Sequence, residues 1–225
     1  MKLHSVDFSL YAQRRERMIR RLTAMGIKDS RVLRAMYDVP RHLFVEDALR
    51  AQAYNDINLP IGGGQTISQP YTVAKMTELL CNGLSGSLKP LRRVLEIGTG
   101  CGYQTAVLES LQIHDIYTVE RIRSLHERAK INFHHTHIAR RIRMKCGDGY
   151  QGWETAAPFD GIIVTAAPSQ VPTALLHQLA IGGRMVLPLD NGRQQFLWLI
   201  EKQEKGFQET CVQEASFVPL LTGLA

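Results

Sequence analysis

The chain has 225 residues, of which 44% are hydrophobic and 21% charged, and its formal net charge is +6. This composition is ordinary for a soluble globular protein and leaves room for one large domain with a small appendage. It excludes a protein built around a membrane span, because no apolar run reaches the roughly 18 residues that a spanning helix needs. The positive charge permits contact with nucleic acid without requiring it, since net charge governs association rather than function.

The N-terminal part of the chain predicts a small helical extension. Apolar residues recur there at helical spacing, and Gly26 and Pro40 end two such runs. In chain order we expect a helix over 9–26, a second helix that Ser30 caps, and a short helix with an extended piece over 41–60. We interpret residues 1–60 as an extension that packs on a core domain over 61–225.

A glycine-rich loop opens the predicted core domain. Gly62, Gly63 and Gly64 indicate a loop that continues to Pro70. Proline suits the first turn of a helix, so we expect a helix from Pro70 to about residue 80. The loop before it offers backbone N–H groups together with the hydroxyls of Thr66 and Ser68.

From Arg93 onward, short runs rich in Val and Ile alternate with helical patterns. This alternation predicts an α/β fold with a doubly wound, mostly parallel, Rossmann-like sheet. Gly182-Gly183 predicts the turn into the fifth strand. The expected strands cover 93–97, 115–119, 142–146, 160–165, 183–188 and 195–201, with a pair of strands over about 207–218. The expected helices cover 102–111, 122–134 and 171–179.

The first of these strands runs into a loop with glycine at every second position: Gly98, Gly100 and Gly102. Glycines here let a nucleotide-like ligand lie close against the backbone. The spacing G-x-G-x-x-G would favour a dinucleotide, whereas this closer spacing, preceded by Glu96, favours a ligand without phosphate and with positive charge beside its nucleoside. S-adenosylmethionine, with its sulfonium and ammonium groups, is such a ligand.

Three acidic residues follow three successive predicted strands: Glu96, Glu120 and Asp148. Because the carboxyl ends of parallel strands meet at one edge of a sheet, we expect the three side chains to surround the ligand. Glu120 would accept both ribose hydroxyls, Asp148 the adenine amino group, and Glu96 would favour the charged methionine end. Nicotinamide cofactors are the nearest competitor, and the glycine spacing disfavours them.

The methyl acceptor is indicated by what the loops lack. No Pro-Pro-Tyr clamp follows the fourth strand, no Pro-Cys pair occurs, and few strong general bases lie near the loops. A carboxylate acceptor, with a pKa of about 4, is already ionised at neutral pH and needs only to be held in line. The cluster His134, His135 and His137 could bind a metal, but we interpret it as the end of a solvated helix and predict no metal site.

Several motifs resemble those of the protein-L-isoaspartate O-methyltransferase family, in the family's order, from about residue 15 to 223. The most specific is Gln-Thr-Ile-Ser-Gln-Pro over 65–70. The others are Val39-Pro40-Arg41, Leu59-Pro60-Ile61-Gly62, the glycine loop after Val94, Val119-Glu120-Arg121, Gly147-Asp148-Gly149, the run from Ile162 to Pro168, and Phe217-Val218-Pro219-Leu220. The resemblance implies methylation of the free α-carboxylate of L-isoaspartyl residues in damaged proteins and peptides, with repair through a succinimide.

The resemblance also implies roles for individual residues. Ser68 stands where the family has its active-site serine, with the expected role of holding the substrate carboxylate. Thr66 and Ile67 would line the methionine pocket. The cofactor-binding set that we predict is Thr66, Ile67, Ser68, Glu96, Gly98, Thr99, Gly100, Gly102, Glu120, Arg121, Asp148 and Gly149.

Two other functions remain open at the level of the sequence. The positive charge allows an S-adenosylmethionine-dependent enzyme acting on RNA or on a small molecule, and the fold allows a non-enzymatic adaptor. Intact acidic residues and Ser68 argue against the adaptor. We expect isoaspartyl proteins and peptides as partners, with no nucleic acid and no membrane, and a monomer. Four cysteines without metal or redox spacing, and an N-terminus without a signal-peptide core, predict a cytoplasmic protein.

Overall fold

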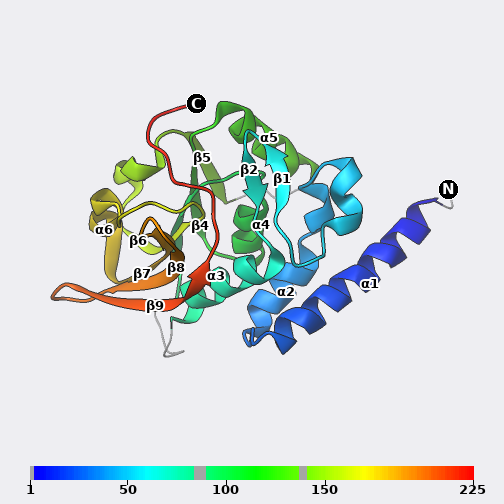
Figure 1. The fold of residues 1–225 in the computed structure, drawn as a ribbon, viewed down its shortest axis with the longest axis horizontal. Helices are drawn as coiled ribbons and strands as arrows, with labels where there is room; N and C mark the ends of the chain where they lie inside the picture. Colours follow the sequence, from blue (N-terminus) through cyan, green and yellow to red (C-terminus); the bar gives the residue numbers. More distant parts are fainter. Residues whose placement is uncertain (1–2, 84–89, 137–140) are drawn as a thin grey trace.

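The computed structural model describes the backbone of residues 3–83, 90–136 and 141–225, and side chains in these ranges from residue 11 onward. A seven-stranded sheet with the order β5-β4-β3-β6-β7-β8-β9 forms its centre (Figure 1). The strands are β3 Arg93–Ile97, β4 Asp115–Glu120, β5 Ile142–Cys146, β6 Phe159–Val164, β7 Leu179–Asp190, β8 Gln195–Lys202 and β9 Phe207–Ala215. The first five strands in sequence are parallel, and β8 and β9 are antiparallel. The predicted doubly wound, mostly parallel sheet is confirmed.

Helices cover both faces of this sheet. On one face α3 packs on β6 and β7, α4 on β4, and α5 on β4 and β5, while α6 and short 3-10 turns lie on the other. Their bounds are α3 Pro70–Asn82, α4 Tyr103–Ser110, α5 Arg123–His135 and α6 Thr173–Gln178, with 3-10 turns η3 Gly149–Gln151 and η4 Glu154–Ala156. Alternating side chains of the buried strands, such as Val94 and Leu95, enter different hydrophobic clusters on the two faces.

The N-terminal segment contributes to the same hydrophobic core as the sheet domain. It contains α1 Leu3–Ala24, α2 Ser30–Asp38, η1 Arg41–Leu43 and η2 Asp47–Gln52, and α1 runs along the outside of the molecule (Figure 1). Met18, Leu22 and Met36 are fully buried in one cluster with Ala106 of α4 and Phe133 of α5. Asp29, not Ser30, caps α2, because its side chain accepts a hydrogen bond from the Arg31 backbone.

The predicted glycine-rich loop contains an antiparallel hairpin. β1 Leu59–Gly62 pairs with β2 Gln65–Ile67, and the glycines between them have positive φ, which glycine adopts without strain. Arg128 of α5 donates to the Ile61 carbonyl at 2.8 Å. The hairpin is therefore held beside the sheet, immediately before α3.

Two boundaries in the C-terminal half were wrong. Gly182-Gly183 does not begin a strand but lies inside β7, where the pairing with β6 shifts register. Only one strand, β9, replaces the expected pair over 207–218. The remainder, residues 216–225, which we call the C-terminal strap, runs back over the sheet edge.

The C-terminal strap is joined to three loops, which follow β4, β5 and β6. Pro219 forms a parallel bridge with Ala167, and the Gly223 N–H donates to the Asp148 carboxylate at 2.8 Å. Arg121 donates to the Gly223 carbonyl at 3.1 Å. Chain segments separated by more than 50 residues thus meet at the carboxyl ends of the strands. Among the described residues, the helices are all too short or too polar to cross a membrane.

Candidate active site

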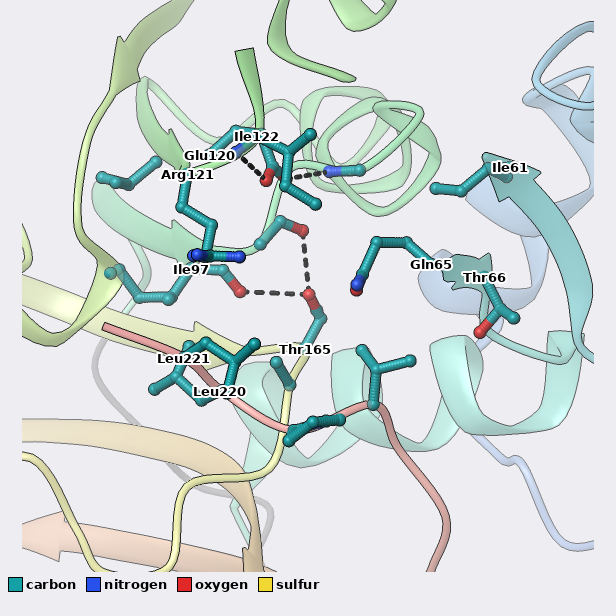
Figure 2. Close-up of a pocket in the computed structure, with 17 residues that line it drawn as sticks. Ile61, Gln65, Thr66, Ile97, Glu120, Arg121, Ile122, Thr165, Leu220 and Leu221 are labelled. Atoms are coloured by element: carbon teal, nitrogen blue, oxygen red, sulfur yellow. Dashed lines mark hydrogen bonds between the residues drawn. The ribbon is translucent and has the colours of Figure 1, made fainter. Parts of the chain in front are cut away.

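Two adjoining cavities lie where β3, β4 and β6 end, between the β1–β2 hairpin and the C-terminal strap, and Figure 2 shows the residues that line the first of them. The first cavity, of about 590 Å³, is lined by Ile61, Gln65, Thr66, Ile97, Gly98, Gly100, Val119, Glu120, Arg121, Ile122, Gly149, Thr165, Ala166, Val218, Pro219, Leu220 and Leu221. The second, of about 420 Å³, is lined by Ile61, Thr66, Ile67, Ser68, Val73, Met76, Gly98, Thr99, Gly100, Cys101, Tyr103, Gln104 and Thr165. Because they share Gly98, Gly100 and Thr165, the two form one elongated space.

The glycine loop after β3 forms the floor of this space. Gly98 has φ +95°, and a Cβ there would lie 2.4 Å from the Thr165 hydroxyl oxygen. That hydroxyl donates to the Gly98 carbonyl at 2.8 Å (Figure 2). Gly100 also has positive φ, and Asn132 of α5 donates to the neighbouring Cys101 carbonyl at 2.8 Å. The loop is therefore held by Thr165 and Asn132, and its remaining surface faces the cavities.

Glu120 ends β4 and forms part of the first cavity's wall. One of its carboxylate oxygens accepts from the Gly100 N–H at 2.8 Å, and the other accepts from the Ile122 N–H at 2.9 Å. Each carboxylate oxygen can accept a further hydrogen bond. Although only 5% exposed, Glu120 thus presents a fixed pair of acceptors to the cavity.

Glu96 faces away from both cavities, because side chains alternate along β3 and Ile97 occupies the cavity side. Its carboxylate is fully buried against α4, where one oxygen accepts from the hydroxyls of Thr105 and Thr118. Thr118 also bonds to the hydroxyl of Thr99, 2.6 Å away in the glycine loop. Burial raises the pKa of Glu96 to about 8.

Ser68 lies on the wall of the second cavity, directly after β2. It is half-buried, and among the described residues its hydroxyl has no hydrogen-bond partner. Its carbonyl accepts a hydrogen bond at 2.7 Å from Arg41, whose side chain is fully buried. Asp56 and Asn58 accept from the backbone N–H groups of Tyr71 and Gln69, so the start of α3 is held as well.

Most of the predicted site residues line this space. The structure brings together Thr66, Ile67, Ser68, Gly98, Thr99, Gly100, Glu120, Arg121 and Gly149. It does not bring Glu96, Gly102 or Asp148 to either cavity wall.

The three exceptions have identifiable structural tasks, and their predicted contact with the ligand stays a prediction. Gly102 begins α4, and a Cβ there would lie 2.5 Å from the Phe133 ring, so glycine allows α4 and α5 to pack. Asp148 caps η3 through the Tyr150 N–H and holds the strap through Gly223. Glu96 supports the glycine loop through Thr118, whose hydroxyl also bonds to Thr99 in that loop.

Several lining residues were not predicted as site residues. Gln65 reaches toward the centre of the first cavity, opposite Thr165 (Figure 2). Leu220 and Leu221 enclose the same cavity from the strap. Thr165 and Leu220 lie within motifs that carry the family resemblance, but the resemblance implied no role for either residue. No local pattern shows that the strap folds back over the sheet.

Among the described residues, neither cavity is lined by more than one side chain of the types His, Cys, Asp or Glu. Within the described ranges, no group of three or more His, Cys, Asp or Glu side chains is placed to hold a metal ion. The rings of His134 and His135 lie 6.1 Å apart in an edge-on arrangement, and both side chains are exposed. His137, the third member of the predicted cluster, lies outside the described residues.

The residues present fit S-adenosylmethionine. The elongated space has a carboxylate with free acceptor capacity in the first cavity and backbone and hydroxyl groups in the second. Between them, Gly100 lacks a Cβ that would lie 3.2 Å from Ile61, so the passage stays open. These features suit a nucleoside at one end and an amino acid at the other.

Comparisons with known proteins agree with this geometry. A family model described as protein-L-isoaspartate(D-aspartate) O-methyltransferase matches residues 13–225. Relatives named protein-L-isoaspartate O-methyltransferase include one from Chromobacterium violaceum, 52% identical over 93% of this chain and 90% of its own length. Another, from Hahella chejuensis, is 50% identical over 93% of this chain and 96% of its own length.

Solved structures with similar names also match. One protein-L-isoaspartate O-methyltransferase has a TM-score of 0.81 and 30% identity, covering 93% of this chain and 67% of that one. A second, from Plasmodium falciparum and in complex with S-adenosyl-L-homocysteine, has a TM-score of 0.78 and 25% identity, covering 91% of this chain and 96% of that one.

Proposed function

The chain belongs to the protein-L-isoaspartate(D-aspartate) O-methyltransferase family, and we propose how its residues transfer a methyl group from S-adenosylmethionine to the free α-carboxylate of L-isoaspartyl residues. The observation that supports this assignment of roles most directly is that Ser68, Glu120 and the glycine loop line one continuous space. The residues that bind the methyl donor and the residue that binds the methyl acceptor can therefore be assigned separately.

The first cavity is the nucleoside end. Glu120 accepts hydrogen bonds from the ribose hydroxyls, because both of its oxygens are already aimed by backbone donors and retain acceptor capacity. The base lies between the backbone of Gly149 and the apolar side chains of Ile122 and Leu220. Asp148 acts indirectly, since its carboxylate holds the strap that closes this end.

The second cavity is the methionine end. Thr66, Ile67 and Thr99 form its walls, and the N-terminus of α4 opens into it at Tyr103 and Gln104. Helix N-termini favour negative charge, which suits the amino-acid carboxylate. When bound, S-adenosylmethionine supplies an electrophilic methyl group on a positively charged sulfur. Glu96 keeps the glycine loop in place through Thr118 and Thr99.

Ser68 holds the substrate. Its unpartnered hydroxyl donates to one oxygen of the isoaspartyl carboxylate and leaves the other in line with the methyl group. A carboxylate needs no general base because it is ionised at neutral pH. This agrees with the lining of the two cavities, which includes no histidine among the residues that the structure describes.

Assembly and location are further parts of the proposal. We propose a monomer acting in the cytoplasm on extended segments of damaged proteins, independently of nucleic acid and membranes. The absence of disulfides supports a reducing compartment, since Cys81, Cys101, Cys146 and Cys211 are all free. Gel filtration with light scattering tests the monomer directly.

The activity is tested with labelled S-adenosylmethionine and three acceptors: an isoaspartyl peptide, the same peptide with normal aspartate, and bulk RNA. We expect base-labile methyl esters with the isoaspartyl peptide alone. Transfer to RNA, without ester on the peptide, would overturn the proposal.

The role of Ser68 is tested by Ser68→Ala. We expect turnover to fall much more than S-adenosylhomocysteine affinity, because the hydroxyl is assigned to the substrate. Thr66→Ala is the matched control, since it removes a hydroxyl from the cavity wall beside it. Equal losses of turnover and cofactor affinity in Ser68→Ala would mean that the serine serves the cofactor.

A further inference from the structure

Arg41 is a buried cation beside the active site that the roles assigned above do not use. Its side chain is completely buried, and it is the last residue of the Val-Pro-Arg motif. Its guanidinium donates to the carbonyls of Ala53 and Ser68, each at 2.7 Å, and lies 4.7 Å above the Tyr103 ring. One fork of the guanidinium therefore joins the N-terminal segment to the residue assigned to the substrate.

No carboxylate neutralises this charge within the described part of the chain. The groups that face Arg41 are the carbonyls, the phenols of Tyr54 and Tyr103, and the thiol of Cys101. The third nitrogen of the side chain, Nη1, is buried without a hydrogen-bond partner. Burial lowers the pKa of Arg41, but a guanidinium stays protonated at neutral pH.

A buried charge without a counter-ion is costly, so its presence needs a compensating interaction. The proposed substrate brings a negative charge to Ser68, whose carbonyl Arg41 already holds. We propose that Arg41 is a positioning residue for the acceptor: it fixes Ser68 through the carbonyl and favours a carboxylate over a neutral group at that place. This inference rests on the proposed function of Ser68.

The shape of the side chain separates the two proposed contributions of Arg41, which are the placement of Ser68 and the preference for a charged acceptor. The fork of an arginine reaches two carbonyls at once, whereas a lysine keeps the charge but offers a single point of contact. Arg41→Lys should therefore keep the preference for a charged acceptor and lose the placement of Ser68. Arg41→Gln should lose the preference.

The chain offers a matched control in Arg184. This side chain is also buried, and it donates to the carbonyls of Leu80 and Cys81 at the end of α3. It lines neither cavity. Arg184→Gln thus removes a buried guanidinium from two carbonyls without touching the site.

The experiment measures binding of two peptides by calorimetry in the presence of S-adenosylhomocysteine. One carries the isoaspartyl α-carboxylate, and the other carries the α-carboxamide at the same residue. At an effective dielectric of about 20, unit charges several ångströms apart attract strongly enough to give a preference on the order of tenfold or more for the carboxylate. We expect Arg41→Gln to abolish this preference and Arg184→Gln to retain it.

Activity provides a second measurement. In Arg41→Lys we expect the preference to stay within about threefold of wild type while kcat falls about tenfold, because Ser68 is no longer held. S-adenosylhomocysteine affinity should stay within about twofold in each variant. An unchanged preference in folded Arg41→Gln would overturn the electrostatic role. If that variant does not fold, a lost preference or an unchanged kcat in Arg41→Lys overturns the proposal.

Failure of the proposed function would look different. In that case the wild-type protein itself would form no ester on the isoaspartyl peptide. A wild-type enzyme that forms the ester, with variants that keep its preference, would reject the inference about Arg41 alone.

Discussion

Replacing Glu96 with glutamine should remove the loss of stability that this carboxyl group causes as the pH rises through neutral. The carboxylate is fully buried, and its second oxygen, Oε1, has no partner. Glutamine is isosteric with the protonated acid, and its carbonyl can still accept from Thr105 and Thr118. Glu96→Gln should therefore match the wild-type protein at low pH, where Glu96 is neutral, and exceed its stability at high pH.

The magnitude follows from the pKa of Glu96, which burial raises from 4.5 to about 8. Between these values the folded protein keeps a proton that the unfolded chain has lost. The stabilisation is complete below pH 4.5 and is lost as the pH rises through about 8. The slope is about 1.4 kcal/mol per pH unit, so the contribution of Glu96 to the free energy of unfolding falls by roughly 4 kcal/mol between about pH 5 and pH 8.

Urea unfolding at several pH values measures this slope without any ligand. Glu127→Gln is the matched control, because Glu127 lies exposed on α5 and its pKa is lowered by Lys130, out of the range measured. We expect the control to follow the wild-type curve, whereas the stability of Glu96→Gln should exceed that of the wild type by a margin that grows with pH. Parallel curves for all three proteins would show that Glu96 is not protonated in the folded state, and the reasoning would fail.

Three further changes test the site. Glu120→Gln should weaken S-adenosylhomocysteine binding about thirtyfold in calorimetry, since an amide nitrogen cannot accept from the backbone donor beside it; unchanged affinity would contradict the ribose role. Gly98→Ala should lower the free energy of unfolding in urea by about 2–4 kcal/mol, because the new Cβ would lie 2.4 Å from the Thr165 hydroxyl oxygen. Gly192→Ala, where φ is also positive but the space is open, should lower it by about 1 kcal/mol. Equal losses in the two variants would refute the clash. Asp148→Ala should weaken S-adenosylhomocysteine binding by about 1.5–3 kcal/mol by releasing the strap, and unchanged affinity would argue against that task.

The sequence predicted the parallel sheet well because each strand carries its own signal. Runs such as 93–97 and 142–146 are short, contain several apolar residues and are bounded by turns, and their bounds agree with β3 and β5. Prediction failed where tertiary contacts decide. Gly182 and Gly183 indicate a turn locally, yet pairing with β6 and β8 draws the segment into a long strand with a register shift.

The site shows the same division between local and tertiary information. A glycine that needs positive φ, such as Gly98, and a carboxylate at a strand end, such as Glu120, are visible in the sequence. Whether Glu96 faces the cavity or the core depends on the register of β3, because a shift of one residue moves a side chain to the other face of the sheet. The strap residues carry no local signal because their partners, Ala167 and Asp148, are distant in the chain.

The span of the cavity wall has a consequence for biosynthesis. Ile61 is the first residue in the chain that lines the first cavity, and Leu221 is the last. The wall of this cavity therefore needs segments that are synthesised far apart in time. A chain still being translated cannot complete the wall until residue 221 has left the ribosome, even when the parallel strands have already been made. Nascent copies of this protein therefore lack the strap side of the first cavity, and stabilisation by the methyl donor is complete only after residue 221 has been synthesised.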